Sequence, residues 1–303
     1  MENVLITGGA GFIGSHVCDL LIEKGYNVIV VDNLSSGFAG NLNKKAKFYN
    51  LDVNSSDLEK VFEENKIDYI FHFAAQANVS FSTKFPEIDA TENVLGSINI
   101  LKSAKKYGIK KFMPASTAAV YGIPKKLPVD EEHETICLSF YGLSKLTMEK
   151  YTELFGVDYI ILRFANVYGP RQSAHGEAGV VAIFADKMKN NEEIIIDGDG
   201  EQTRDFVYVE DIAKACLCAI ESDVKNEIIN ISTNMAISIN KLFSIMKDKC
   251  NYKKTASYGA IRPGDIKHSI LDNTKCQELF NFSPKTSIED GLKTLFTEIV
   301  NNY

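Results

Sequence analysis

A tyrosine and a lysine four positions apart are the residues best suited to acid–base chemistry. Tyr141 and Lys145 open a long helical pattern over residues 140–155, and of the three Tyr-x-x-x-Lys segments only this one begins a helix. Positions i and i+4 share one helix face, so the phenol and the ammonium should be neighbours. We expect the ammonium to favour the phenolate and to lower the pKa of Tyr141 from about 10 toward neutrality. Such a phenol can exchange a proton with a substrate hydroxyl.

A hydroxyl is expected close to this tyrosine. Ser116 and Thr117 end a predicted strand that begins near Phe112. In parallel sheets, ligands bind beyond the carboxyl ends of the strands, which is where both hydroxyls would lie. One of them can therefore complete a group that handles a proton. The alternative is that Tyr141 is an ordinary packed tyrosine of a helix.

A glycine-rich turn near the N-terminus predicts a dinucleotide site. Residues 7–14 read TGGAGFIG, follow a short apolar strand and open a helix, and Asp32 ends the next strand eighteen residues after Gly14. This is the context of a dinucleotide fingerprint, in which glycines admit the pyrophosphate and the helix N-terminus offers free N–H groups. Asp32 would bind the adenosine ribose and repel a 2′-phosphate, and no Arg precedes Arg163. The predicted cofactor is therefore NAD rather than NADP.

The elements that must position these groups alternate between strand and helix. Apolar, β-branched runs such as 4–7 and 28–32 fit strands buried on both faces of a parallel sheet. Further strands are predicted at 47–49, 69–73, 112–113 and 159–162, and helices at 12–24, 56–65, 88–106 and 140–155. This alternation predicts an α/β fold with a doubly wound parallel sheet of the Rossmann type.

The chain is predicted to have two domains. Residues 1–165 would form the NAD-binding domain, and a smaller α+β substrate domain would occupy 166–303, where Gly and Pro cluster in longer loops. Within a segment near 205–232, the apolar run 227–231 has the composition of a strand that returns to the large sheet. We expect the site in the cleft between the two domains.

Composition restricts the possible functions. The 303 residues are 45% hydrophobic and 24% charged, as in soluble globular proteins, and 33 Lys and Arg against 40 Asp and Glu give a net charge of −7. This acidic balance argues against nucleic acid as a partner, and no apolar run reaches the roughly 18 residues of a membrane span. Six scattered cysteines and five histidines form no ligand pattern, so no metal is expected. Free thiols and an N-terminus without an export signal favour a cytoplasmic protein.

The arginines indicate an anionic substrate. Only four of the 33 basic residues are Arg, and all lie at or after position 163. A chain that uses Lys on its surface keeps Arg where a planar bidentate donor is needed, as for phosphate. Arg204 and Arg262 lie beside turns of the smaller domain, and a substrate diphosphate would explain both. Ion pairing within the protein is the alternative, and it is favoured for Arg163, which lies inside a strand.

Longer motifs extend this pattern over nearly the whole chain. They occupy residues 7–37, 71–76, 116–122, 141–145, 162–171, 176–184 and 197–206. In these motifs the chain resembles the extended short-chain dehydrogenase/reductases, and within them the nucleotide-sugar epimerases of the UDP-glucose 4-epimerase type. The resemblance implies an isomerase of galactose metabolism. It would interconvert UDP-glucose and UDP-galactose by transient oxidation at C4 with a bound NAD.

The resemblance also implies roles for individual residues. Tyr141 would be the catalytic acid and base, Lys145 would tune it and hold the nicotinamide ribose, and Thr117 would bind the sugar 4-oxygen. Besides Tyr141 and Lys145, the residues implied in NAD binding are Gly8, Gly11, Phe12, Ile13, Gly14, Asp32, Asn33, Asp52, Val53, Phe73, Ala74, Ala75 and Asn93. Besides Thr117, those implied in UDP-sugar binding are Asn166, Val180, Arg204, Arg262, Asp265 and Ser269.

Related activities differ in the residues that they need. Nucleotide-sugar 4,6-dehydratases carry an acidic pair where this chain has Ala118 and Ala119, which disfavours dehydration and also UDP-glucuronate decarboxylation. UDP-glucuronate 4-epimerisation stays open, since it needs only the same Tyr–Lys–Thr group. Ser269 stands where bulky residues restrict the pocket in related enzymes, so N-acetylated UDP-hexosamines are a further candidate. A non-catalytic NAD-sensing module is the alternative from another class, although such proteins typically lose the Tyr or the Lys.

The resemblance further implies a homodimer. Two helices of each subunit would pack together, and the segments 88–106 and 140–155 would provide them. Leu95, Ile98 and Leu101 are the contacts that we expect there.

Overall fold

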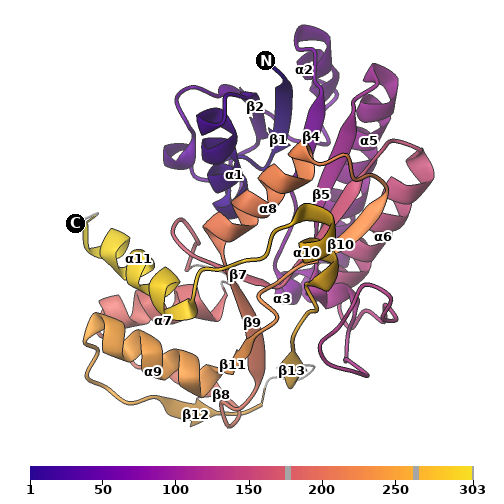
Figure 1. The fold of residues 1–303 in the computed structure, drawn as a ribbon. Helices are drawn as coiled ribbons and strands as arrows, with labels where there is room; N and C mark the ends of the chain where they lie inside the picture. Colours follow the sequence, from indigo (N-terminus) through magenta and orange to yellow (C-terminus); the bar gives the residue numbers. More distant parts are fainter. Residues whose placement is uncertain (175–178, 262–265, 302–303) are drawn as a thin grey trace.

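The computed structural model describes residues 1–174, 179–261 and 266–301. Seven parallel strands form its large sheet, in the order β10-β6-β5-β4-β1-β2-β3, and Figure 1 shows this sheet in the upper part of the molecule. The predicted fold class is confirmed. The seven strands are β1 (Asn3–Thr7), β2 (Asn27–Asp32), β3 (Lys47–Asn50), β4 (Tyr69–His72), β5 (Lys111–Thr117), β6 (Ile160–Phe164) and β10 (Glu227–Ile231).

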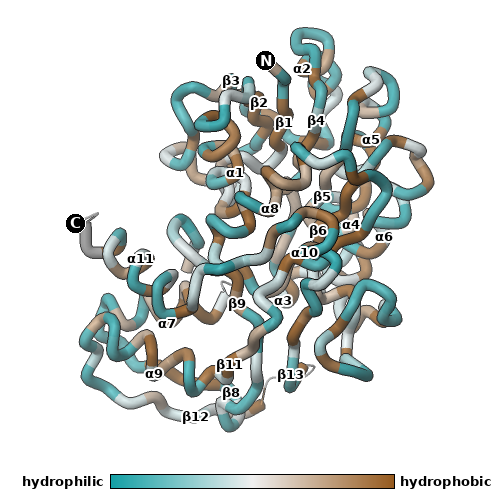
Figure 2. The backbone as a smooth tube through the Cα atoms, viewed as in Figure 1, coloured by the Kyte–Doolittle hydropathy of each residue, from teal (hydrophilic) through white to brown (hydrophobic). Residues whose placement is uncertain are grey.

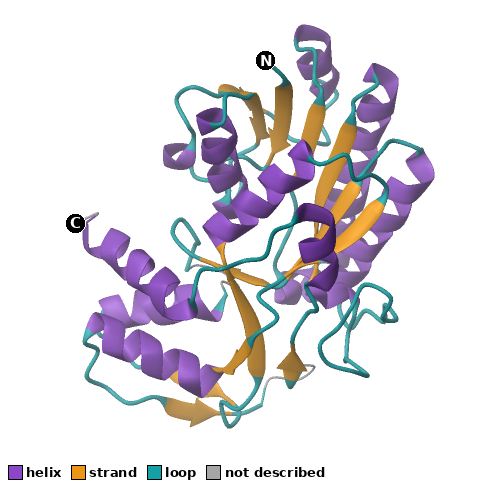
Figure 3. Ribbon diagram, in the orientation of Figure 1, coloured by secondary structure: helices purple, strands orange, loops and turns teal. Residues whose placement is uncertain are grey.

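Helices cover both faces of the large sheet (Figure 3). They include α1 (Phe12–Glu23), α2 (Leu58–Glu64), α5 (Gly96–Tyr107), α6 (Phe140–Phe155) and α8 (Val209–Glu221). Val4 and Ile6 of β1 share a core with α1 and α8, whereas Leu5 between them shares one with α2 and α5. Successive side chains of a strand point to opposite faces, so a strand covered on both sides must be apolar throughout. Figure 2 shows the resulting hydrophobic stretches along these strands.

The connection between β4 and α5 is helical in three steps. It consists of α3 (Val79–Lys84), α4 (Pro86–Ala90) and a π-helical turn (Thr91–Leu95) that continues directly into α5. Pro86 fits the start of α4, because the first position of a helix needs no backbone N–H donor. One expected dimer contact is wrong: Leu101 is 0% exposed and lies in the core below α5.

The second half of the chain builds smaller sheets with their own core. A four-stranded sheet joins β11, β9 and β13, with β7 also paired to β9, and a two-stranded sheet joins β12 and β8. Tyr168, Phe184, Phe206, Leu242 and Leu292 lie in this core. Figure 1 shows the smaller sheets and the helices around them below the large sheet. The elements are β7 (Asn166–Tyr168), α7 (Val180–Lys189), β8 (Ile195–Asp197), β9 (Thr203–Tyr208), β11 (Ala236–Ser238), α9 (Ile239–Cys250), β12 (Ser257–Gly259), β13 (His268–Ser269) and α11 (Ile288–Asn301). By contrast, α10 (Thr274–Phe280) packs against β10 and α8, and its Cys276 lies in the core of the large sheet.

The segment around β10 leaves this second half and completes the large sheet. β10 pairs with β6 over five residues, with Ile229 opposite Leu162. The buried Lys111 of β5 donates hydrogen bonds to the carbonyls of Ala219 and Ser222 at the end of α8, at 2.9 and 2.7 Å. A cation at the C-terminus of a helix is favoured by the helix dipole, so this contact fixes α8 against the sheet.

Candidate functional site

A close approach of α6 to the end of β5 brings Thr117 and Tyr141 together. Ser139 caps α6, since its hydroxyl accepts a hydrogen bond from the backbone N–H of Gly142 at 3.1 Å. A Cβ on Gly142 would lie 2.8 Å from the carbonyl oxygen of Ala119, so only glycine lets α6 come this close to the 3₁₀ turn after β5. The hydroxyl of Thr117 then donates a hydrogen bond to the phenol oxygen of Tyr141.

The Tyr141–Lys145 pair is largely removed from water. Lys145 is 5% exposed and donates a hydrogen bond to a backbone carbonyl near the end of β5 at 3.1 Å. Burial lowers the pKa of Lys145 to about 8, and the charges of Asp89 and Glu149 oppose that change. Burial raises the pKa of Tyr141 to about 12, although the hydrogen bond from Thr117 acts to lower it. The expected lowering of the Tyr141 pKa is therefore wrong for this structure, because desolvation of the phenolate outweighs the hydrogen bond from Thr117.

Of the two predicted hydroxyls, only Thr117 faces the tyrosine. Neighbouring side chains of a strand point to opposite faces, and Ser116 turns away to donate a hydrogen bond to the carboxylate of Glu149. Arg163 of β6 makes two hydrogen bonds to the same carboxylate, at 2.9 and 2.6 Å, and both side chains are almost fully buried. Arg163 and Glu149 thus form an ion pair behind the site, and Ser116 is hydrogen-bonded to it, in agreement with the interpretation of Arg163 as an internal ion-pair partner.

The glycine turn after β1 can accommodate a pyrophosphate. Gly8 has a φ of 71°, and a Cβ there would lie 2.6 Å from the backbone nitrogen of Ala74. A Cβ on Gly14 would collide with the carbonyl oxygen of Gly8, so the turn folds tightly onto the start of α1. Gly11 is the N-cap of α1, with no side-chain cap and no acidic residue in the first turn. The free N–H groups and the positive end of the helix dipole are thus available to an anion.

Residues predicted to hold the adenosine lie together at the ends of β2 and β3. Asp32 is 7% exposed, and its carboxylate accepts hydrogen bonds from the backbone N–H groups of Ala10 and Leu34 at 2.9 and 2.8 Å. The side-chain amide of Asn33 donates to the carboxylate of Asp52 at 2.7 Å. The structure therefore brings Asp32, Asn33 and Asp52 to one sheet edge, and their contact with adenosine stays a prediction.

Most other predicted dinucleotide residues follow the ends of β1 and β4. Those that are half-buried at this edge are Phe12, Ile13, Phe73, Ala74 and Ala75. Val53 differs, because it is 5% exposed and packs in the hydrophobic core with Leu5.

Asn93 lies in a buried polar network that the sequence analysis did not anticipate. Its amide oxygen accepts a hydrogen bond from the backbone N–H of Gln76 at 2.9 Å. Its amide nitrogen lies 3.1 Å from the carboxylate of Asp89 and 3.0 Å from the hydroxyl of Ser144. The spacing of Asp89 and Asn93, i and i+4 on one helix face, is the signal that could have joined them. A contact between Asn93 and NAD stays a prediction.

Two predicted substrate residues stand side by side in the small sheet. β13 runs parallel to β9, and Ser269 is in register with Arg204. Both residues are half-buried, and Arg204 also donates a hydrogen bond to the carbonyl of Thr203 at 2.8 Å. The structure thus unites a cation and a small side chain that the sequence separates by 65 positions.

The remaining predicted substrate residues are less closely grouped. Asn166 is exposed at the start of β7, two residues after Phe164, which is in register with Thr117. Val180 is half-buried at the first position of α7. Arg262 and Asp265 lie outside the described residues.

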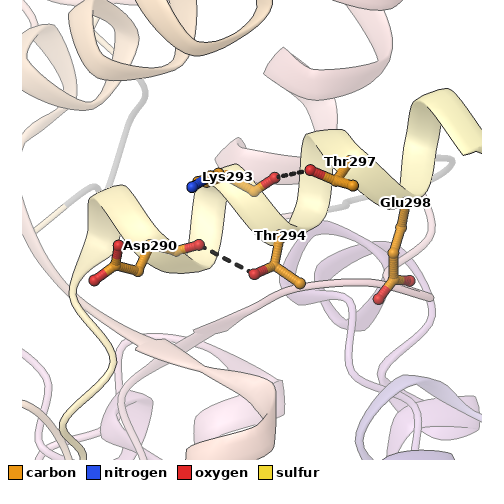
Figure 4. A pocket seen from close by; sticks show the side chains of 5 residues that line it. All are labelled: Asp290, Lys293, Thr294, Thr297 and Glu298. Atoms are coloured by element: carbon orange, nitrogen blue, oxygen red, sulfur yellow. Dashed lines mark hydrogen bonds between the residues drawn. The ribbon is translucent and has the colours of Figure 1, made fainter.

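A shallow depression elsewhere on the molecule does not belong to this site. It measures about 340 Å³ and lies along α11 (Figure 4). Its lining consists of Asp290, Lys293, Thr294, Thr297 and Glu298. Thr294 and Thr297 donate their hydroxyl hydrogens to carbonyls of the same helix, at 3.2 and 2.8 Å. None of the predicted site residues lines this depression.

Within the described residues, the structure contains neither a metal-ion cluster nor a membrane-spanning helix. No three His, Cys, Asp or Glu side chains among them are grouped so as to hold a metal ion. Every helix that they form is too short or too polar to cross a bilayer.

Comparisons with known proteins give a consistent result. The model of the NAD dependent epimerase/dehydratase family matches residues 4–232. A putative UDP-glucose 4-epimerase from Methanocaldococcus jannaschii is 47% identical over 304 residues, which cover 99% of each chain.

Two solved structures are similar over almost the full length. The UDP-glucose 4-epimerase of Thermotoga maritima, determined with UDP-glucose, superposes with a TM-score of 0.97 at 46% identity and 99% coverage of both chains. The UDP-N-acetylglucosamine 4-epimerase of Methanobrevibacter ruminantium, in complex with UDP-N-acetylmuramic acid, gives a TM-score of 0.95 at 36% identity. That match covers 100% of this chain and 99% of the other.

Proposed function

The chain belongs to the NAD-dependent epimerase/dehydratase family, and on this premise we propose that it interconverts UDP-hexoses at C4 with a bound NAD. The observation that carries the proposal is the group formed by Thr117, Tyr141 and Lys145. It lies at the same carboxyl edge of the sheet as the glycine turn, in a chain that aligns end to end with 4-epimerases. UDP-glucose and UDP-galactose are the first substrates to test.

NAD fits the residues at this edge. The uncapped N-terminus of α1 and the glycines before it suit a pyrophosphate, and the buried carboxylate of Asp32 suits two ribose hydroxyls but opposes a 2′-phosphate. Lys145 would hold the nicotinamide ribose. When bound, NAD supplies the hydride acceptor for C4 and a positive charge close to the phenol.

Tyr141 would act as both base and acid. Its phenolate would take the proton of the sugar 4-hydroxyl, and the phenol formed would return that proton after the oxidised sugar has turned over. Because burial raises the pKa of Tyr141 to about 12, the phenolate needs hydrogen-bond donors and positive charge around it. Thr117 supplies the donor and Lys145 the cation. Thr117 can also bind the 4-oxygen of the sugar, since it already reaches the phenol.

Arg204 would hold the diphosphate while the sugar turns. A guanidinium binds phosphate oxygens with two parallel hydrogen bonds, and such a clamp keeps C4 within reach of Tyr141 through both half-reactions. Asn166, Val180, Arg262 and Asp265 are proposed to complete the UDP site.

Ser269 is proposed to widen the range of sugars. Its register with Arg204 puts a small side chain beside the proposed diphosphate clamp. Room at this position would admit the N-acetyl group of UDP-hexosamines, and the similar structure of a UDP-N-acetylglucosamine 4-epimerase supports this extension.

A panel of UDP-sugars tests the proposal. The purified protein is incubated without added NAD with UDP-galactose, UDP-N-acetylgalactosamine or UDP-glucuronate, and products are separated chromatographically. We expect the 4-epimers of the first two and no net NADH. Turnover of UDP-glucuronate alone would assign the protein to the uronate epimerases. Bound NAD without turnover of any sugar would favour the non-catalytic NAD-sensing module.

The domain roles, assembly and location are further parts of the proposal. NAD is assigned to residues 1–165 with the segment near 205–232, and the UDP-sugar to 166–303. A homodimer is supported by exposed apolar side chains on neighbouring helices, Leu95 beside α5 and Leu143 on α6, each 51% exposed. Six free cysteines fit a reducing cytoplasm, and the net charge of −7 fits neither nucleic acid nor an anionic membrane as partner.

A further inference from the structure

A buried carboxylate lies beside the catalytic turn of α6. Asp89 of α4 is 1% exposed. It accepts hydrogen bonds from the side-chain amides of Gln76 at 2.7 Å and Asn93 at 3.1 Å. In the described parts of the chain, no Lys or Arg forms an ion pair with it. Since an isolated charge away from water is costly, the charge of Asp89 needs a counter-charge that acts through space.

A chain of hydrogen bonds connects this carboxylate with the catalytic turn. The amide nitrogen of Asn93, bonded to Asp89, also lies 3.0 Å from the hydroxyl of Ser144. Ser144 directly precedes Lys145, and its hydroxyl donates a hydrogen bond to the backbone carbonyl of Tyr141 at 3.0 Å. The turn that carries Asn93 is π-helical, a rare conformation that recurs at functional sites. Asp89 is therefore mechanically coupled to the backbone of the first turn of α6.

Both reacting groups respond to the charge of Asp89. Burial has the largest effect on the pKa of Lys145 and lowers it. The charge of Asp89 opposes this change and raises the pKa of Lys145 more than Glu149 does. Burial has the largest effect on the pKa of Tyr141 and raises it, and the charge of Asp89 raises this pKa further. A negative charge stabilises an ammonium and destabilises a phenolate, so both effects have the same sign.

The other ionisable groups near the pair are already compensated or neutral. Glu149 is held by Arg163 through two hydrogen bonds. His72 on β4 is 2% exposed, and burial lowers its pKa to about 3, so it is uncharged near neutral pH. Of the two described carboxylates whose charge acts on Lys145, Asp89 is therefore the one without a cation bonded to it.

We propose that Asp89 is the counter-charge of the Lys145 ammonium and, through Asn93 and Ser144, a positioning residue for the catalytic turn. Its charge acts on Lys145 through space, and its positioning role acts through Asn93 and Ser144. The inference rests on the proposed function only in so far as Tyr141 and Lys145 are the reacting pair.

The test replaces Asp89 by the isosteric, uncharged Asn. Loss of the negative charge should lower the pKa of Lys145 and of Tyr141, each by about one unit. The first change is read directly by NMR titration of protein labelled with [ε-¹³C]lysine, with the resonance assigned by its absence in Lys145→Arg. The second readout is the pH profile of kcat/KM for UDP-galactose, whose two limbs should both move to lower pH by about one unit.

Controls separate charge from structure. Asp89→Glu keeps the charge and should restore the wild-type pH profile. Asp211→Asn removes another buried carboxylate, which accepts the backbone N–H groups of Lys285 and Thr286, and should leave the profile in place. If thermal unfolding shows that Asp89→Asn folds poorly, the smaller Asp89→Ser repeats the removal of charge.

The outcomes are distinct. An unchanged Lys145 titration and pH profile, with only a lower kcat, would show that Asp89 is structural and overturn the inference. If wild-type protein turns over no UDP-sugar, the proposed function fails, whereas the NMR titration still decides whether Asp89 balances Lys145.

Discussion

The phenol oxygen of Tyr141 is the atom on which the proposed chemistry depends, and it shares a hydrogen bond with Thr117. We predict that Tyr141→Phe lowers kcat by about 10² to 10⁴-fold, because it removes the proton-transfer group and leaves the ring in place. The initial rate of UDP-galactose epimerisation and the bound NAD content measure the effect. Tyr151→Phe, an exposed tyrosine of the same helix, is the control and should keep wild-type activity. Equal rates for Tyr141→Phe and wild type would exclude the mechanism.

Single residues also show the limit of local sequence patterns. The spacing of Tyr141 and Lys145 correctly predicted that the two residues open a helix, and strand alternation separates Thr117 from Ser116. The pKa of Tyr141 was predicted wrongly because a pattern shows the neighbouring charge but not the depth of burial. Asp89 was also missed, because the network around it is built from separate segments: Gln76 donates to its carboxylate, and Asn93 connects it to Ser144 of α6.

Elements are held in register by the network behind the site. Glu149 joins α6 to Ser116 of β5 and to Arg163 of β6, and the side chains of Arg163 and Glu149 are 3% and 0% exposed. We predict that Glu149→Gln lowers the free energy of unfolding by about 3–5 kcal/mol, because Arg163 then stays buried without its counter-charge. Urea unfolding measures this change.

The matched control for Glu149 lies on the same helix. Glu153 pairs with Lys150 at 3.0 Å on the surface, and Glu153→Gln should cost about 1 kcal/mol or less. The double variant Glu149→Met with Arg163→Met should recover most of the lost stability, because neither charge remains unpaired. Equal effects of Glu149→Gln and Glu153→Gln would contradict the prediction.

Elements with strong periodicity were the easiest to predict. The α6 pattern over 140–155 agrees residue for residue with the structure, and β10 agrees likewise with the apolar run 227–231. The π-helical turn was not predicted, because its local sequence continues the α-helical pattern. The small sheet was not predicted strand by strand, since β11 and β13 have only three and two residues and are defined by pairing with β9.

The proposed homodimer can be tested on the surface that α6 forms with the turn before α5. Leu95 and Leu143 are each 51% exposed there, and burial of such side chains stabilises an interface. We predict that Leu95→Asp combined with Leu143→Asp converts a dimer to a monomer, as measured by light scattering after size-exclusion chromatography. Leu279→Asp, on an exposed position of α10, is the control and should remain dimeric. A double variant that stays dimeric would place the interface elsewhere.

The stability of the whole molecule should depend on His72. Thr7 and Ser97 lie 2.7 and 3.0 Å from its ring nitrogens, and burial lowers its pKa to about 3. Between about pH 6.5 and 3, the unfolded chain binds a proton that the native protein does not, so stability falls as the pH falls.

A difference measurement isolates this contribution. As the pH falls below 6.5, the free energy of unfolding of wild type should decrease, relative to that of His72→Gln, by about 1.4 kcal/mol per pH unit. The decrease between pH 6.5 and 5 is then about 2 kcal/mol. Urea unfolding of both proteins at pH 7.5 and 5.0 measures it, and His268→Gln at an exposed position serves as the control. Parallel pH dependences of wild type and His72→Gln would contradict the prediction.

The position of β10 has a consequence for how the protein is made. β10 closes one edge of the large sheet, yet it is separated from its neighbour β6 by the whole of residues 165–226. A ribosome therefore releases six strands of that sheet while the outer hydrogen-bonding groups of β6 still have no strand to pair with. The half of the enzyme that begins at the N-terminus is finished only after residue 231 of 303 has been translated.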